Sequence, residues 1–219
     1  MKIYHGSKVI LEEVKVKGSN PTNDYGPAFY VTTDLSAAKS WACRNDSAGV
    51  VNEYEIDSRS FQNLKILDLT DKSKYSVLNW LAILMHFRKL NDSFKRDYTE
   101  LIKWLEKFYV DVDEYDVVKG YRADDAYFRF PLSAIMSQLA IEDLEEVFML
   151  GELGVQYAFV SKRSIDLLHF KIVIQCEDKF IGEYLKTIQE ATRKFNAMLG
   201  KPVDPKKHFM LDLWRKDNE

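Results

Sequence analysis

The chain has few cysteines and no long uninterrupted apolar run. Its 219 residues include only Cys43 and Cys176, which are too few for a disulfide framework and lack metal-ligand spacing. The longest apolar stretch, 77–87, contains Asn79 and His86 and is shorter than the roughly 20 residues of a membrane-spanning helix. The first residues contain no apolar segment typical of a secretion signal. These absences predict a soluble cytoplasmic protein that does not enter a membrane.

Several familiar catalytic motifs are also missing. The sequence has no glycine-rich phosphate loop, no His-Glu-x-x-His and no nucleophile elbow around Cys43 or any serine. The four histidines and two cysteines show no metal-binding spacing, so no metal is expected. The formal net charge of −3 gives no overall attraction to nucleic acid.

The hydrophobic pattern predicts an α+β fold, with strands toward both ends of the chain and helices between them. Strands are expected at 2–4, 29–32, 50–56, 64–69, 115–119, 156–161 and 167–175. Helices are expected after Asp34, twice within 75–109 and then at 133–148, 177–199 and 204–219. We expect one domain over residues 1–176 with a helical insertion at about 75–110. Residues 177–219 should form a helical extension packed on the same domain.

Residues 23–41 combine a loop, a short strand and a capped helix. Asn, Asp, Gly and Pro in 23–27 favour a turn, and the aromatic and β-branched residues of 29–32 favour a strand. Asp34, or Thr33 before it, is suited to cap the following helix. Such a unit can present Tyr30 into a cleft, although a buried aromatic at an ordinary strand–helix junction gives the same pattern.

Three pieces of sequence occur in an informative order. His5-Gly6-Ser7 ends the first strand, Gly26–Thr32 carries Tyr30 into the helix, and Gln156 begins a late aromatic-rich strand. In this order they resemble the ADP-ribosyltransferases of the diphtheria-toxin and poly-ADP-ribose-polymerase type. The closest likeness is to a small bacterial, toxin-like branch, and it covers about residues 2–175. The resemblance implies a split β-sheet core, to which the helical insertion and the C-terminal helices are added.

The resemblance also implies a function. The chain is expected to be an NAD-dependent mono-ADP-ribosyltransferase, which transfers ADP-ribose from NAD to a macromolecular acceptor and releases nicotinamide. NAD is then a substrate, the acceptor is a protein or a nucleic acid, and an antitoxin protein of a toxin–antitoxin system is a candidate partner. The alternative is a module of the same fold that binds NAD or ADP-ribose with little or no turnover. An NAD-using RNA 2′-phosphotransferase would require a basic cluster around the phosphate that is not evident.

The binding roles follow from the family pattern. His5 would bond a ribose hydroxyl of the adenosine half, and the backbone of Gly6 would pair with the nicotinamide carboxamide. Ser7 would contact the nicotinamide-side ribose. Tyr30 would stack on the nicotinamide ring, with Tyr25 or Tyr121 as a second aromatic face.

The third position departs from the family pattern. Relatives usually carry Glu where this chain has Gln156, which can accept a hydrogen bond but supplies no negative charge. This argues against polymer formation and leaves mono-ADP-ribosylation, weaker catalysis or a different acidic residue. Glu152 is the first candidate, to activate the acceptor or to supply the charge; the alternative is a solvated loop carboxylate. Asp124, which we also count among the NAD-binding residues, and Asp125 come next.

Other charged and apolar segments allow two interpretations each. Arg122 would pair with the NAD pyrophosphate or form a salt bridge with Asp124 or Asp125. The basic residues of the helical insertion would form a local basic face or an ordinary solvated surface. The amphipathic segment 180–214 would dock a partner or pack on the core.

Overall fold

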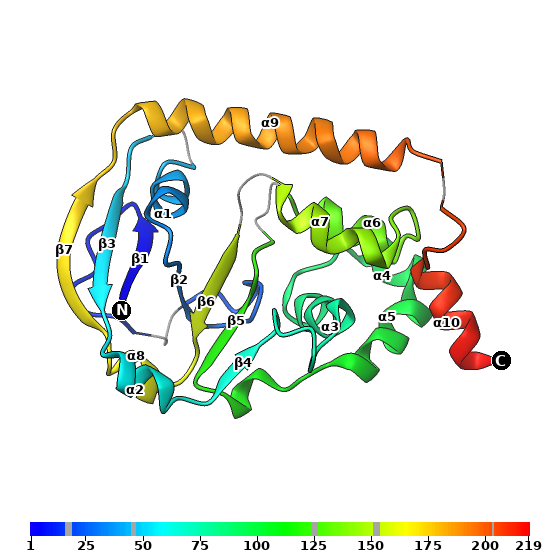
Figure 1. The fold of residues 1–219 in the computed structure, drawn as a ribbon, viewed down its shortest axis with the longest axis horizontal. Coiled ribbons are helices and arrows are strands. Elements are labelled where there is room, and N and C mark those ends of the chain that lie inside the picture. Colours follow the sequence, from blue (N-terminus) through cyan, green and yellow to red (C-terminus); the bar gives the residue numbers. More distant parts are fainter. Residues whose placement is uncertain (16–18, 45–46, 124–126, 151–153, 203) are drawn as a thin grey trace.

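The fold combines two β-sheets with a group of helices beside them and one long helix that runs along both parts (Figure 1). The computed structural model describes residues 1–15, 19–44, 47–123, 127–150, 154–202 and 204–219. Within them the fold is α+β, as the sequence predicted. No helix among these residues is both long enough and apolar enough to cross a lipid bilayer.

The strands form a three-stranded and a four-stranded sheet. The first sheet is antiparallel and contains, in spatial order, β1 (Lys2–Ser7), β3 (Val50–Glu55) and β7 (His169–Gln175). The second contains, in spatial order, β2 (Phe29–Val31), β6 (Val155–Phe159), β5 (Val117–Tyr121) and β4 (Ile66–Asp68). Only the β4–β5 pair of the second sheet is parallel. All seven predicted strands are therefore confirmed, with shifted ends.

The two sheets meet where β1 passes the end of β2. The Tyr4 amide donates to the Thr32 carbonyl oxygen at 2.8 Å, and the Thr32 amide donates to the Tyr4 carbonyl oxygen at 3.0 Å. This bridge holds the last residues of β1 beside Tyr30.

Helix α1 (Leu35–Ala42) packs closely against β1. The Asp34 carboxylate accepts from the amides of Ser36 (2.7 Å) and Ala37 (3.2 Å), which confirms the predicted cap. A Cβ atom at Gly6 would collide with the Ala38 carbonyl oxygen and lie 2.8 Å from the Ala42 nitrogen. The close approach of α1 to β1 therefore requires glycine at position 6.

The helical insertion lies in the right-hand half of the molecule in Figure 1, which consists mainly of helices and which we call the helical half. It contains α3 (Val77–Phe87), α4 (Asp92–Asp97), α5 (Thr99–Leu105) and the short 3-10 helices η1 (Glu106–Phe108) and η2 (Val112–Glu114). Two helices were predicted here, and the second is broken at Tyr98, whose backbone is not helical. Helix α3 is apolar on most of its surface, and seven of its residues are therefore buried.

The prediction of a single helix at 133–148 is wrong. Instead, α6 (Arg129–Ile135), the 3-10 helix η4 (Ile141–Asp143) and α7 (Leu144–Phe148) follow one another. The break lies at Ser137, which has a φ of 55°, and the amides of Gln138 and Leu139 both donate to the Ser133 carbonyl oxygen. No glycine or proline marks this turn in the sequence. Two short helices, α2 (Ser58–Gln62) and α8 (Lys162–Ile165), were also not predicted.

The C-terminal extension connects the two halves. Helix α9 (Lys179–Leu199) runs from the end of the first sheet to the helical half, and α10 (Met210–Asn218) follows it (Figure 1). The Phe195 ring stacks on Phe130 with 4.1 Å between ring centroids, and Met210 is fully buried. The extension thus packs on the rest of the chain.

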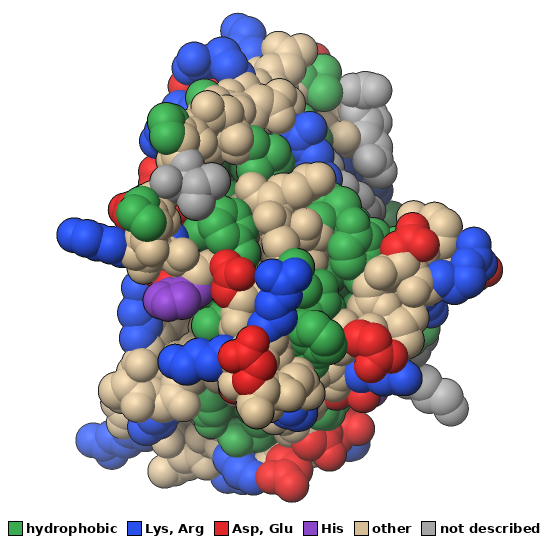
Figure 2. Space-filling model, turned by 90° about the vertical axis from the view of Figure 1, so that its right-hand side faces the viewer, with side chains coloured by type: hydrophobic (Ala, Val, Ile, Leu, Met, Phe, Trp, Pro, Cys, Tyr) green, Lys and Arg blue, Asp and Glu red, His purple; other side chains and the backbone are tan. Residues whose placement is uncertain are grey.

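The end of the molecule that includes the helical half carries charges of both signs. Figure 2 shows Lys and Arg side chains interspersed with Asp and Glu around exposed hydrophobic groups on this face. Within α5, Lys103 lies 3.3 Å from the Glu100 carboxylate. On this visible face the basic residues therefore do not form a patch of one sign.

We expect Gly6→Ala to lower the free energy of unfolding by about 1–3 kcal/mol, because the added methyl group forces α1 away from β1. Urea unfolding followed by circular dichroism measures the change. Gly182→Ala is the matched control: it lies exposed in α9 with nothing within 4 Å of an added Cβ, and should stabilise by up to about 1 kcal/mol. Equal stabilities of Gly6→Ala and the native protein would contradict the packing argument.

Candidate functional site

A cavity of about 930 Å³ opens at the junction of the two sheets. It is lined by the end of β1, by β2, by one side of α1 and by the start of β6. The loop 19–24, the two residues after α3 and the two residues after β5 also contribute to the wall. Its volume lies in the range of about 300–1,000 Å³ that is typical of small-molecule and cofactor sites.

Six of the residues predicted from the sequence line this cavity. They are His5, Gly6, Ser7, Tyr30, Arg122 and Gln156. They come from segments that are far apart in the chain and that the two sheets bring together. Glu152 and Asp124, with Asp125, lie outside the described residues.

His5 is held as a neutral side chain with a defined tautomer. Its Nδ1 lies 2.7 Å from the Tyr30 carbonyl oxygen, which can only accept, so Nδ1 carries the proton. Burial lowers the pKa of His5 below its usual value, and the positive charges of Arg122 and Arg44 act in the same direction. The Nε2 atom therefore remains as a hydrogen-bond acceptor.

The Tyr30 ring is fixed by its hydroxyl group. The hydroxyl donates to the Gly26 carbonyl oxygen at 2.7 Å and accepts from the Tyr25 amide at 3.0 Å. Gly26 has a φ of 75°, and a Cβ there would lie 2.5 Å from the Phe87 ring, so this turn requires glycine. Burial raises the pKa of Tyr30 far above its usual value. Tyr30 thus offers a rigid neutral aromatic wall and not a base.

The structure corrects the predicted second aromatic face. Tyr25 is fully buried, and its hydroxyl donates to the Tyr121 carbonyl oxygen at 2.5 Å and accepts from Trp80 Nε1 at 2.9 Å. The Tyr121 ring packs on Trp80 and Phe148, with centroids 6.4 and 5.1 Å away. Neither tyrosine lines the cavity. Tyr25 instead packs against Tyr30, with 6.4 Å between the ring centroids, and the Tyr121 carbonyl oxygen holds the Tyr25 hydroxyl.

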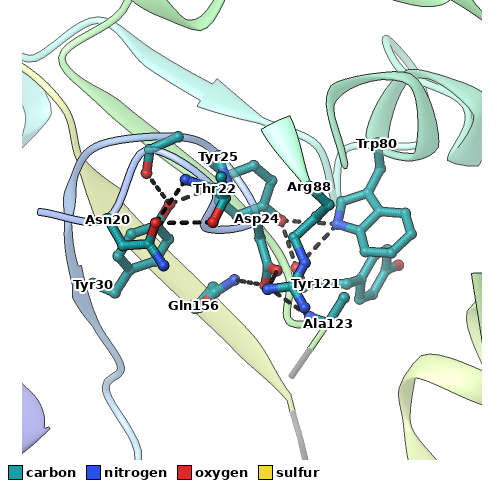
Figure 3. Close-up of polar contacts among 11 residues, drawn as sticks. Asn20, Thr22, Asp24, Tyr25, Tyr30, Trp80, Arg88, Tyr121, Ala123 and Gln156 are labelled. Carbon is teal, nitrogen blue, oxygen red and sulfur yellow. Dashed lines mark hydrogen bonds and ion pairs between the residues drawn. The ribbon is translucent and has the colours of Figure 1, made fainter. Parts of the chain in front are cut away.

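Asp24 lines the cavity but was not predicted from the sequence as part of the site. Its side chain is almost completely buried at the cavity wall, where Oδ2 accepts from Gln156 Nε2 and from the Ala123 amide, both at 2.8 Å (Figure 3). Its Oδ1 lies 3.5 Å from Arg88 Nη1. Burial raises the pKa of Asp24 to about 6, and the Ala123 amide, Arg88 and Gln156 oppose this rise. Nothing in the sequence distinguishes it from an ordinary turn aspartate.

Trp41 brings two guanidinium groups to the cavity. The guanidinium carbon of Arg122 lies 3.4 Å from the Trp41 ring centroid, and that of Arg44 lies 3.9 Å from it. Such contacts orient the planar cation while leaving its N–H groups directed along its edge. Arg44 was not predicted, because an arginine shortly after a helix is a common surface feature.

The described lining residues carry mostly positive charge. Their cations are Lys8, Lys15, Arg44, Arg88, Lys89 and Arg122, and their only carboxylate is Asp24. Arg88 and Lys89 belong to the basic residues that the sequence assigned to the helical insertion. A concave site lined in this way attracts anions, phosphate groups above all.

The arrangement suits a phosphorylated ligand with hydroxyl groups and an aromatic ring. It offers cations, a neutral imidazole acceptor, an aromatic wall and a buried carboxylate–amide pair. Among the described residues, no group of three or more His, Cys, Asp or Glu side chains is placed to hold a metal ion.

Fold and site together define an α+β protein with a basic, aromatic-walled cavity. Residues 1–170 match the model of a family described as "Protein of unknown function (DUF3990)", and the chain belongs to this family. No curated protein and no solved structure shows a significant match. The matched region contains every described residue that lines the cavity, whereas α9 and α10 lie beyond it.

The raised pKa of Asp24 predicts a characteristic pH dependence of stability. Because the folded protein holds this proton more tightly than the unfolded chain, the protonated carboxyl stabilises the fold at low pH. That stability, at most about 3 kcal/mol, is lost as the pH rises from about 4 through about 6.

Urea unfolding of the native protein and of Asp24→Asn at about pH 4 and about pH 7 measures this contribution. Subtracting the two proteins removes the titration of every other group. The free energy of unfolding of the native protein, relative to that of Asp24→Asn, should be larger at about pH 4 than at about pH 7. A difference that is the same at both pH values contradicts the assignment.

Proposed function

We propose that the protein is an NAD-dependent mono-ADP-ribosyltransferase that transfers ADP-ribose to a macromolecular acceptor and releases nicotinamide. The observation that carries this proposal is the convergence of His5, Tyr30 and Gln156 on one basic cavity. A role as a toxin, with an antitoxin protein as its partner, belongs to the same proposal. It rests on the sequence resemblance alone.

The sheet arrangement supports the proposal. The sequence resemblance implies a split β-sheet core. Here two sheets are joined through the Tyr4–Thr32 bridge, and the cavity opens beside that bridge.

The cavity walls suit the parts of NAD in order. The pyrophosphate would lie against Arg44 and Arg122, which are held on Trp41. A ribose hydroxyl would donate to His5 Nε2. The nicotinamide ring would stack on Tyr30, with its carboxamide at the backbone of Gly6.

The Ser7 hydroxyl group can donate one hydrogen bond to the ligand. Its Oγ accepts from the Val9 amide at 3.1 Å, which leaves the hydroxyl proton to donate. It is therefore suited to the nicotinamide-side ribose.

The chemistry needs positioning and charge more than a strong nucleophile. The bond between the ribose C1′ and the nicotinamide nitrogen breaks, and nicotinamide leaves with the electron pair. The positive ribose is then attacked by an acceptor atom, which loses its proton. Ordered donors and a buried negative charge can stabilise such a transition state strongly. Glu152 remains our candidate base for the acceptor.

One observation favours a second function. Gln156 carries no charge at the position where relatives usually have Glu, so the site would also suit a module that binds NAD or ADP-ribose with little turnover. Retention of NAD without release of nicotinamide would support this alternative.

Incubation with NAD and measurement of free nicotinamide by chromatography tests the proposal. We expect release by the native protein in the presence of cell lysate as the source of acceptor. Tyr30→Ala should reduce kcat/KM by about tenfold or more, because it removes the stacking surface for the nicotinamide ring.

Tyr115→Ala is the matched control. Tyr115 is also partly exposed but does not line the cavity, so its removal should leave nicotinamide release unchanged. Binding of NAD with no release by the native protein would refute the transferase and leave the binding module.

A further inference from the structure

We propose that Asp24 and Gln156 act as one split functional unit, in which Gln156 contacts the nicotinamide-side ribose and Asp24 supplies the negative charge behind it. Asp24 is a positioning residue in this unit, since it acts through the amide of Gln156. The inference rests on the proposed transferase function and concerns how this chain performs it without a glutamate at position 156.

The contact between the two side chains fixes the orientation of the amide. Gln156 Nε2 donates to Asp24 Oδ2 at 2.8 Å, which identifies the nitrogen side of an otherwise symmetric-looking group (Figure 3). The amide oxygen must then point away from the carboxylate. Gln156 lines the cavity, and we infer that this oxygen accepts from a ribose hydroxyl.

The backbone around Gln156 keeps this orientation rigid. Gln156 lies in β6, paired in register with Gly120 of β5. Asp24 accepts from the Ala123 amide just beyond the end of the same β5 strand. Carboxylate and amide are therefore both anchored to the β5–β6 pair, and neither can turn without breaking a buried hydrogen bond.

Through the hydrogen bond, the charge of Asp24 also affects the amide of Gln156. A carboxylate that accepts from an amide N–H polarises the amide, so that its oxygen becomes a stronger acceptor. In a buried site this effect, and the direct field of the carboxylate, are less screened than in water. Positive charge that develops on the ribose would then be stabilised by a group that is itself neutral.

The same geometry explains why glutamate does not suit position 156. A carboxylate in place of the amide would face Asp24 Oδ2 at hydrogen-bonding distance. Two carboxylates this close cannot both be ionised, so one would take up a proton. The shared proton would let the negative charge lie on either carboxylate, whereas the neutral amide of Gln156 keeps it on Asp24.

The surroundings of Asp24 determine its ionisation. Burial has the largest effect on the pKa of Asp24 and favours the neutral form, whereas the Ala123 amide, Arg88 and Arg122 favour the charged form. The phenol groups of Tyr25 and Tyr30 lie close by and stay neutral because burial raises their pKa. His5 titrates in the same cavity with a lowered pKa, so its contribution has to be separated experimentally.

A double-mutant cycle tests the split unit. The proteins are native, Asp24→Asn, Gln156→Glu and Asp24→Asn/Gln156→Glu, and the readouts are kcat and KM for nicotinamide release. Each single variant should lose about tenfold to a hundredfold in kcat, because one lacks the charge and the other forms a carboxylate pair. The double variant restores one charge beside one amide, so its kcat should exceed that of both single variants.

The pH profile of kcat provides a readout that a purely structural role would not change. In the native protein kcat should fall as the pH drops through the pKa of Asp24, whereas Asp24→Asn should lose this dependence and retain only that of His5. Gln156→Met keeps Asp24 and the side-chain volume, so it tests the amide even if Asp24→Asn does not fold. It should lose kcat to a similar extent.

The outcomes separate the two proposals. If the native protein releases nicotinamide and the double variant is no better than either single variant, the split unit is wrong and the transferase stands. An unchanged pH profile in a folded Asp24→Asn leads to the same conclusion. If the native protein releases no nicotinamide, the proposed function fails and this inference fails with it.

Discussion

The buried carboxylate of Asp24 is the constraint on which the cavity depends. A charge removed from water is tolerated only when hydrogen bonds and opposite charges surround it. Its partners come from β6, from the residues after β5 and from the end of α3. The loop that carries Asp24 can therefore take its place only when all three segments are in position. One carboxylate ties the wall of the cavity to both the sheet and the helical half.

The helical insertion becomes part of the site through this constraint. Trp80 of α3 donates to Tyr25, whose amide in turn donates to the Tyr30 hydroxyl. The Arg88 side chain reaches Asp24 from the end of the same helix. The insertion thus supports the aromatic wall and the carboxylate from behind. A ligand site supported in this way is preorganised, so that little conformational freedom is lost when a ligand binds.

Local patterns predicted the parts of the structure that local forces determine. Short apolar, aromatic and β-branched runs identified the strands, and Asp34 capped α1 as expected. The pieces around His5, Tyr30 and Gln156 also converge on one cavity, although their roles in catalysis stay predictions. The errors at Tyr25, Tyr121 and 133–148 arise where tertiary contacts or an unmarked turn decide the outcome. Asp24 was missed because its partner Gln156 is 132 residues away in the chain, and no local sequence pattern shows that the two side chains are in contact.

A crystal structure of the complete chain with an NAD analogue whose ribose–nicotinamide bond cannot be cleaved tests the central claim most directly. The account predicts the nicotinamide ring stacked on Tyr30, with ring centroids about 4.5–7 Å apart. It also predicts a ribose hydroxyl bonded to the Gln156 amide oxygen, with Asp24 still bonded to Nε2. An analogue bound outside this cavity, or bound with its nicotinamide at Trp41 and away from Tyr30, would contradict it.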